Sequence, residues 1–276
     1  MEADEIGLRG VQETLLVTLR AKAAESALPD SLLKDHFAAD LVRRLNGRTR
    51  APSVGHDMTI GIAVRAYMLD RWTRAFIQRY PDAVVLNLGC GLDTRVLRLD
   101  PPPRVAWFDI DFPDVIALRQ NLFADRAGCT TIASSITERA WIDRIPDDRA
   151  TIVVAEGVLP YLSEQEVRDL LRRLTSCLSG GEIVFDAYSR LGIEILRYNP
   201  SLRATGAEFR WGMEDARALE RDLPGLTLLE EISQYDAGQV ARLSPMARIA
   251  AHVVSSLPML RRLGRLLRYR FSGTAA

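Results

Sequence analysis

Hydrophobic positions in the first third of the chain recur at the three- and four-residue spacing of an amphipathic helix. The pattern is clear over residues 15–19 and again over residues 32–45, and a longer stretch over residues 62–80 ends at Pro81. Proline rarely continues a helix, so this last stretch is expected to stop there. We interpret residues 1–80 as a helical N-terminal cap that is part of the same domain as the rest of the chain.

From residue 81 onward the pattern changes to short apolar runs rich in β-branched residues, which are typical of buried strands. Five runs are expected to form strands, at residues 83–88, 104–111, 130–133, 150–156 and 181–186. Helical segments lie between them, at residues 94–99, 114–127 and 163–178. This alternation predicts an α/β fold with a doubly wound, mostly parallel sheet over residues 81–276.

Three later segments depart from this rhythm. Residues 188–215 form a long insertion, and insertions of this kind often serve as a lid or a substrate wall. Residues 226–232 are expected to form late strands at the sheet edge. The tail, residues 260–271, places arginines among leucine and tyrosine. It predicts a terminal amphipathic helix docked on its own domain, with a helix lying on a membrane surface as the alternative.

Composition narrows the class of protein without indicating a reaction. The chain has 276 residues with 36 basic and 36 acidic side chains, so no net field draws it to nucleic acid. The three cysteines are scattered and form no CxxC pair, which argues against a disulfide framework or a zinc site and favours a cytoplasmic protein. No apolar run reaches the ~20 residues that a membrane span requires. The sequence leaves a homo-oligomer open.

The first candidate for ligand binding is the loop after the first expected strand, from Asn87 to Gly91, which contains Gly89 and Cys90. Glycines in such a loop let backbone N–H groups approach a ligand without a Cβ in the way. A dinucleotide-binding loop would carry a third glycine, and this chain has Thr94 at that position. The loop therefore suits a nucleoside ligand without a pyrophosphate, although a structural turn explains two glycines equally well.

Acidic residues end two further strands at what should be the same edge of the sheet. Asp109 and Asp111 close the second strand, where a carboxylate commonly accepts hydrogen bonds from ribose hydroxyls. A helix N-cap ahead of Pro113 is the alternative role for one of them. Glu156, followed by Gly157, ends the fourth strand, and it is either a ligand contact or an exposed strand-end carboxylate.

Several runs of the chain resemble, in order, the signatures of the leucine carboxyl methyltransferase-like family. They are residues 85–95, 109–116 and 156–162, with Arg65 upstream and residues 209–212 downstream. More narrowly, these runs are similar to the bacterial branch typified by the tetracenomycin polyketide O-methyltransferase. The resemblance covers nearly the whole chain and implies a class I S-adenosylmethionine-dependent methyltransferase fold.

The resemblance also implies roles for individual residues toward S-adenosylmethionine. Arg65, with Lys22 as a weaker candidate, would pair with the methionyl carboxylate, since a guanidinium matches a carboxylate in geometry. Glu156 would sit near the methionyl amino group and Tyr161 near the sulfonium. Ser135 stands where the family often has an acidic residue near the adenine. The other expected contacts come from the glycine loop and the strand ends: Asn87, Gly89, Cys90, Gly91, Gly157 and Asp111, with Asp109 as its substitute at the ribose.

The acceptor side of the site is less defined. Methyl transfer from a sulfonium is an in-line displacement, in which the protein mainly aligns the nucleophile and excludes water. A hydroxyl acceptor can need a general base, whereas a carboxylate does not. His56, in a polar loop before the Arg65 helix, is the first candidate for a base. Tyr188 and Arg210 of the insertion are candidates for substrate contact. The residues predicted to take part in catalysis are thus His56, Tyr161 and Arg210.

We therefore expect an O-methyltransferase that acts on a hydroxyl or carboxylate of a small molecule in bacterial polyketide or other secondary metabolism. Two alternatives stay open, because function depends on the site and not on the fold alone. One is a non-methylating catalyst or binding protein that retains the S-adenosylmethionine pocket. The other is an NAD-dependent dehydrogenase. No metal is expected at the site.

Overall fold

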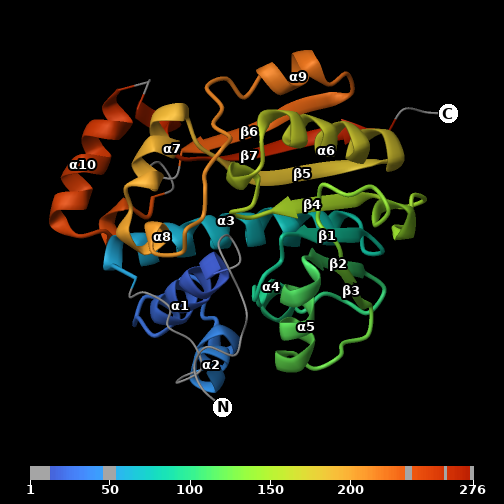
Figure 1. Cartoon of the computed structure of the whole chain (residues 1–276), viewed down its shortest axis with the longest axis horizontal. Coiled ribbons are helices and arrows are strands. Elements are labelled where there is room, and N and C mark those ends of the chain that lie inside the picture. Colours follow the sequence, from blue (N-terminus) through green and yellow to red (C-terminus); the bar gives the residue numbers. More distant parts are fainter. Residues whose placement is uncertain (1–12, 46–53, 234–237, 258–259, 274–276) are drawn as a thin grey trace.

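A seven-stranded sheet forms the centre of the protein in the computed structural model (Figure 1). The structure describes residues 13–45, 54–233, 238–257 and 260–273. The strands are β1 (Val84–Leu88), β2 (Ala106–Asp111), β3 (Cys129–Ala133), β4 (Thr151–Ala155), β5 (Gly180–Ala187), β6 (Leu226–Ser233) and β7 (Arg265–Ser272). Their order is β3-β2-β1-β4-β5-β7-β6, in which β1 to β5 are parallel and β7 is antiparallel to both neighbours. The predicted α/β fold with a mostly parallel sheet is confirmed.

Helices cover both faces of this sheet. They are α1 (Thr14–Ser26), α2 (His36–Leu45), α3 (His56–Arg79), α4 (Arg95–Leu99), α5 (Pro113–Leu122), α6 (Glu164–Cys177), α7 (Arg190–Arg197), α8 (Pro200–Arg203), α9 (Ala218–Asp222) and α10 (Pro245–Ser256). On one face α3 buries Leu69 and Trp72 in a cluster with Val85 of β1. On the other, α6 buries Leu170 in a cluster with Leu86. Strands buried on both sides explain why the sequence shows continuous apolar runs.

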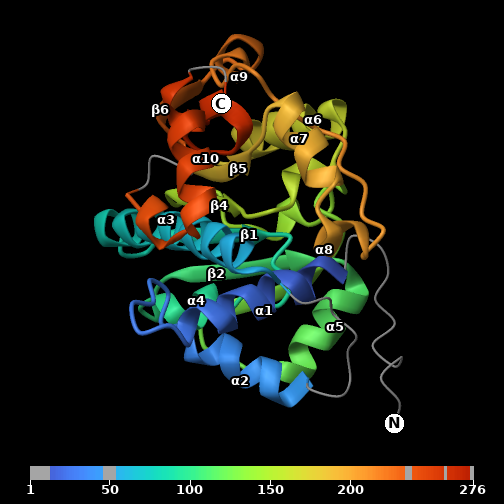
Figure 2. The same cartoon turned by 90° about the vertical axis from the view of Figure 1, so that its left-hand side faces the viewer.

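The first two helices pack away from the sheet, against the helix that follows β2 (Figure 2). Leu19 of α1 and Leu41 of α2 share a hydrophobic cluster with Val115 of α5. The division of the chain at residue 80 stays a prediction. Helix α3 belongs to the expected N-terminal cap, and it also packs directly on the sheet. Residues 1–12 and 46–53 of that cap lie outside the described residues.

The tail is a strand, so the prediction of a terminal helix was wrong. β7 lies between β5 and β6, and from residue 267 to residue 272 its side chains alternate between buried and more exposed. The spacing of its arginines suits a helix, but Arg265 pairs with Glu231 at 2.9 Å and Arg268 with Glu182 at 2.7 Å. Both acids belong to the neighbouring strands. The late strand expected near residues 226–232 is confirmed as β6.

The chain crosses over on either side of β1, and this topology positions the site. β1 pairs with β2 on one side and with β4 on the other. In open α/β sheets, ligands bind at such a switch point, outside the carboxyl ends of the strands. The glycine loop after β1, the acids of β2 and Glu156 after β4 all lie at this edge. No described helix is long and apolar enough to cross a membrane.

Candidate active site

The loop after β1 places backbone atoms at the switch point. Gly89 and Gly91 have φ angles of 61° and 48°, in the left-handed region that glycine enters readily. A Cβ on Gly89 would lie 2.6 Å from Cγ2 of Val158, so the packing there requires glycine. The N–H of Gly91 donates to the carboxylate of Asp111 at 2.7 Å. The glycines therefore make a structural turn, and the same turn lines a cavity.

Asp109 is a structural anchor within the sheet edge. It is buried, and its carboxylate accepts hydrogen bonds from the side-chain nitrogens of Asn87 at 2.8 Å and Trp107 at 3.0 Å. Arg119 of α5 approaches the other carboxylate oxygen to 2.6 Å. These partners occupy Asp109, which is not among the described residues that line the cavity.

Asp111, two residues further on, faces the cavity instead. Its carboxylate accepts the backbone N–H groups of Gly91 and Phe112 at 2.7 and 2.8 Å. A carboxylate has about four lone-pair positions, so capacity remains for ribose hydroxyls. Burial raises the pKa of Asp111 above its usual value, and the two backbone hydrogen bonds oppose that shift. Of the two acids of β2, Asp111 is the one that can reach a ligand.

A network of buried ion pairs joins helices α1, α3 and α4 to the ends of β4 and β5. It has four cations and five carboxylates, with side chains at most 11% exposed: Lys22, Arg65, Arg95, Arg98, Asp35, Asp70, Asp93, Glu156 and Asp186. Glu156 is at its centre, 3.1 Å from Nζ of Lys22, 3.4 Å from Nε of Arg65 and in contact with Nη2 of Arg95. Buried charges are tolerated when they are paired in this way.

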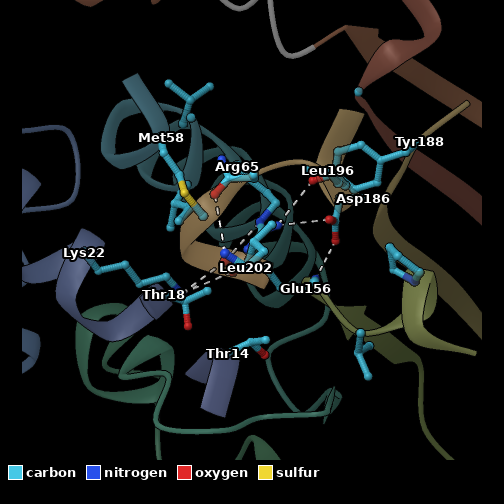
Figure 3. Close-up of a pocket in the computed structure, with 18 of the residues that line it drawn as sticks. Thr14, Thr18, Lys22, Met58, Arg65, Glu156, Asp186, Tyr188, Leu196 and Leu202 are labelled. Atoms are coloured by element: carbon cyan, nitrogen blue, oxygen red, sulfur yellow. Dashed lines mark hydrogen bonds and ion pairs between the residues drawn. The ribbon is translucent and has the colours of Figure 1, made fainter. Parts of the chain in front are cut away.

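Arg65 projects from α3 and connects the network to β5 (Figure 3). Its Nη1 lies 3.1 Å from Oδ2 of Asp186 and 3.4 Å from the hydroxyl of Tyr188. Burial would lower the pKa of Arg65, but Asp186, Tyr188 and Glu156 outweigh it and raise that pKa. Burial would likewise raise the pKa of Glu156, but the surrounding cations, Lys22 first, hold it at about 2. Both side chains are therefore charged at neutral pH.

The cavity at this sheet edge has a volume of about 490 Å³, which is typical of a small-molecule site. One part is polar and is lined by the glycine loop, Asp111 and members of the ion-pair network. The other part is apolar and is lined mainly by the insertion after β5, the start of α3 and α10: Met58, Leu196, Leu202, Phe209, Leu243, Ala247 and Val254. Tyr161 stacks on Phe209, with ring centroids 4.9 Å apart. The cavity thus has two chemically different halves.

Three other predicted residues lie outside this cavity. His56 is exposed at the start of α3, with Nε2 2.9 Å from the carbonyl oxygen of Arg242. Ser135 and Arg210 line a second cavity of about 250 Å³ that adjoins the first along the glycine loop. Arg210 there lies 3.4 Å from Glu166. The remaining predicted residues all line the first cavity: Lys22, Arg65, Asn87, Gly89, Cys90, Gly91, Asp111, Glu156, Gly157, Tyr161 and Tyr188.

The structure adds residues that the sequence analysis did not single out. Asp93 lies two residues after the glycine loop and binds Lys22 at 3.0 Å, and its place beside that loop was an available signal. Asp186 closes β5 much as Glu156 follows β4, which was a comparable signal. Arg95 gave no signal in the sequence, because an arginine in a short helix cannot be told from an exposed arginine until its partners are known.

The residues present fit S-adenosylmethionine. Asp111 offers a carboxylate to a diol, and Gly89 leaves the turn without a Cβ. The network carries one carboxylate more than it has cations, which suits a cofactor with a net positive charge. Arg65 lines the cavity, and its guanidinium has the geometry to pair with a carboxylate. No group of three or more potential metal ligands occurs in the described part of the chain.

Several known proteins similar to this chain are methyltransferases. The model of the leucine carboxyl methyltransferase family matches residues 14–175. The tetracenomycin polyketide synthesis O-methyltransferase TcmP of Streptomyces glaucescens is 42% identical over 269 residues, which cover 97% of this chain and 99% of TcmP. The S-adenosylmethionine-dependent methyltransferase dpfgK of Gibberella zeae is 35% identical over 253 residues, 84% of this chain and 85% of dpfgK.

A solved structure from Thermobifida fusca, assigned as a methyltransferase, superposes with a TM-score of 0.60 over 98% of this chain and 97% of its own. Its 14% identity means that this likeness shows the fold alone. The predicted class I methyltransferase fold and the use of S-adenosylmethionine are thereby confirmed, and the NAD-dependent alternative is not supported. The chain belongs to the leucine carboxyl methyltransferase family and is an S-adenosylmethionine-dependent methyltransferase.

Proposed function

We propose that this enzyme methylates an oxygen that is already anionic, on a small and largely apolar acceptor. The observation that carries the proposal is the lack of a free base: no histidine is among the described residues that line the cavity. Its carboxylates are engaged: Glu156, Asp93 and Asp186 by cations, Asp57 by Ser244 and Asp111 by backbone N–H groups. An acceptor that must lose a proton during transfer finds no obvious group to take it.

The two tyrosines of the cavity do not fill this role at neutral pH. Burial raises the pKa of Tyr161 to about 12 and raises that of Tyr188 as well. Both hydroxyls are therefore neutral hydrogen-bond groups rather than bases. A carboxylate, which is ionised before it binds, needs no base, and a strongly acidic phenol would also qualify.

The polar half of the cavity is proposed to hold the cofactor. When bound, S-adenosylmethionine supplies a methyl group attached to a sulfonium. After transfer the sulfur is a neutral thioether, so its departure needs no acid. Arg65 and Lys22 are placed for the methionyl carboxylate, Glu156 for the amino group and Asp111 for the ribose. Ser135, at the adjoining cavity, is proposed to face the adenine. The protein's remaining task is to align the acceptor and exclude water.

The apolar half is proposed to hold the acceptor. It is built largely from residues after position 186, whereas the family match ends at residue 175. This half therefore differs from the shared cofactor-binding part, as expected of an acceptor site. TcmP acts in polyketide synthesis, and an aromatic polyketide acid would match both the apolar walls and the need for an anionic oxygen.

A competition between two oxygens tests the proposal. The enzyme is incubated with methyl-labelled S-adenosylmethionine and 3-hydroxy-2-naphthoate, which carries a carboxylate and a phenol on one ring system. We expect a methyl ester, whose label mild alkali releases. Acetate, which lacks the apolar body, serves as the control and should not react. Label that resists alkali, as an aryl methyl ether does, would contradict the proposed chemistry.

A further inference from the structure

Exposed apolar side chains on α7 continue the wall of the cavity out to the solvent. Leu191, Ile195 and Tyr198 are between 49% and 75% exposed. Their spacing of four and three residues puts them on one side of the helix. Ile195 also lines the cavity, as does its neighbour Leu196. The apolar surface therefore does not stop at the cavity but reaches the outside of the protein.

A second exposed apolar stripe lies on α10 and its C-cap. Met246, Ile249, Val253 and Leu257 are between 50% and 77% exposed and follow the spacing of one helix face. The alanines of the same helix line the cavity. Both α7 and α10 contact the turn formed by Leu260–Leu263, and the two helices lie near one another in both views (Figures 1 and 2). We call these two stripes together the α7–α10 rim.

The charge around the rim is mainly positive, and the exposed acid on α7, Glu194, is paired with Arg197. The sequence from Gly238 to Gly264 contains four arginines and neither aspartate nor glutamate. Of these, Arg242 is occupied by Glu25 at 2.9 Å, whereas Arg248 is exposed on α10. The whole chain is neutral, so this stretch is a local positive excess and attracts anionic surfaces.

We propose that the α7–α10 rim docks on the surface of an anionic lipid membrane. Apolar side chains flanked by arginine are the pattern of helices that lie in the membrane interface. A second copy of the chain would bring two arginine-rich faces together, which disfavours self-association. The exposed residues are mostly aliphatic, whereas protein interfaces depend on tryptophan, tyrosine and arginine anchors. Docking would bring the apolar half of the cavity close to lipid, so that an apolar acceptor could enter from the membrane. Acceptor entry rests on the proposed function, whereas docking itself does not.

Co-sedimentation with vesicles tests the docking of the full-length enzyme. Wild-type protein is mixed with vesicles of phosphatidylcholine alone or of phosphatidylcholine and phosphatidylglycerol at about three to one. We expect binding to the mixed vesicles only, reduced at least about fivefold by the double variant Ile249→Gln, Val253→Gln and about threefold by Arg248→Gln. These positions are exposed, so cofactor affinity measured by titration should stay unchanged and report intact folding.

Two matched controls stand far from the rim. Tyr80→Gln changes an exposed aromatic at the opposite end of the 24-residue helix α3, about 36 Å from its start. Arg172→Gln removes an exposed arginine of α6. Both should sediment as wild type. No sedimentation with mixed vesicles overturns the proposal, and so does a wild-type dimer that the double variant converts to a monomer. Neither outcome depends on methyl transfer, so failure here is distinct from failure of the proposed function.

Discussion

Replacing Glu156 with glutamine tests the buried ion-pair network most sharply. The change removes one negative charge and keeps the shape of the side chain. Lys22, Arg65 and Arg95 would then meet a neutral amide. Breaking a buried pair by removing one partner costs about 3–5 kcal/mol of folding free energy. Each cation keeps another carboxylate in the network, so we expect the lower end, about 3 kcal/mol.

Urea denaturation of Glu156→Gln and wild type measures this difference. Glu164→Gln is the matched control, because Glu164 pairs with Arg168 on α6 but is 64% exposed, and it should change stability by less than about 0.5 kcal/mol. The pKa of Glu156 is lowered from 4.5 to about 2 in the folded protein. The stabilisation that the ionised Glu156 provides is therefore complete above the pKa of the unfolded chain, and it is lost as the pH falls toward the pKa of the folded protein. The wild-type advantage should therefore be constant at neutral pH and shrink below about pH 4.5. An effect below about 1 kcal/mol at pH 7 would refute the reasoning.

Three further predictions concern the ligand contacts. Arg65→Ala should weaken S-adenosylmethionine binding by about 1.5–3 kcal/mol in calorimetric titration, and unchanged affinity in a folded variant would remove Arg65 from the site. Asp111→Ala should weaken binding and cost about 1–3 kcal/mol of stability, because the N–H groups of Gly91 and Phe112 lose their acceptor. Asp109→Ala should cost more stability, about 3–5 kcal/mol, because Arg119 loses its partner. A loss of binding in Asp109→Ala and not in Asp111→Ala would exchange their roles. Methyl transfer to a carboxylate should not vary between about pH 7 and pH 9, since Tyr161 stays protonated, and a titration in that range would reveal a base.

The parts of the fold that could be predicted from the sequence are those with local signals. β1 and β4 are mostly apolar and are buried along their whole length, because both faces of the sheet are covered. The glycines after β1 and the acid at the end of β2 mark the carboxyl edge of the sheet, where the topology places them side by side. The position of the candidate site therefore followed from short stretches of sequence.

The parts that could not be predicted depend on partners distant in the chain. Asp109 and Asp111 look equivalent in sequence, and only Arg119, ten residues on, makes the first a structural residue. His56 looked like a base in a polar loop, and the structure turns it to the backbone of Arg242, 186 residues away. β7 has the arginine spacing of a helix, yet pairing with two strands overrides that local pattern.

The central claim is that this cavity binds S-adenosylmethionine and not a dinucleotide. Calorimetric titration of the purified protein with S-adenosylmethionine, with S-adenosylhomocysteine and with NAD tests it most directly. The account predicts affinities on the order of micromolar for the first two, no heat of binding for NAD, and a clear loss of affinity in Asp111→Ala. Binding of NAD, or no binding of either sulfur nucleoside by the folded protein, would contradict it.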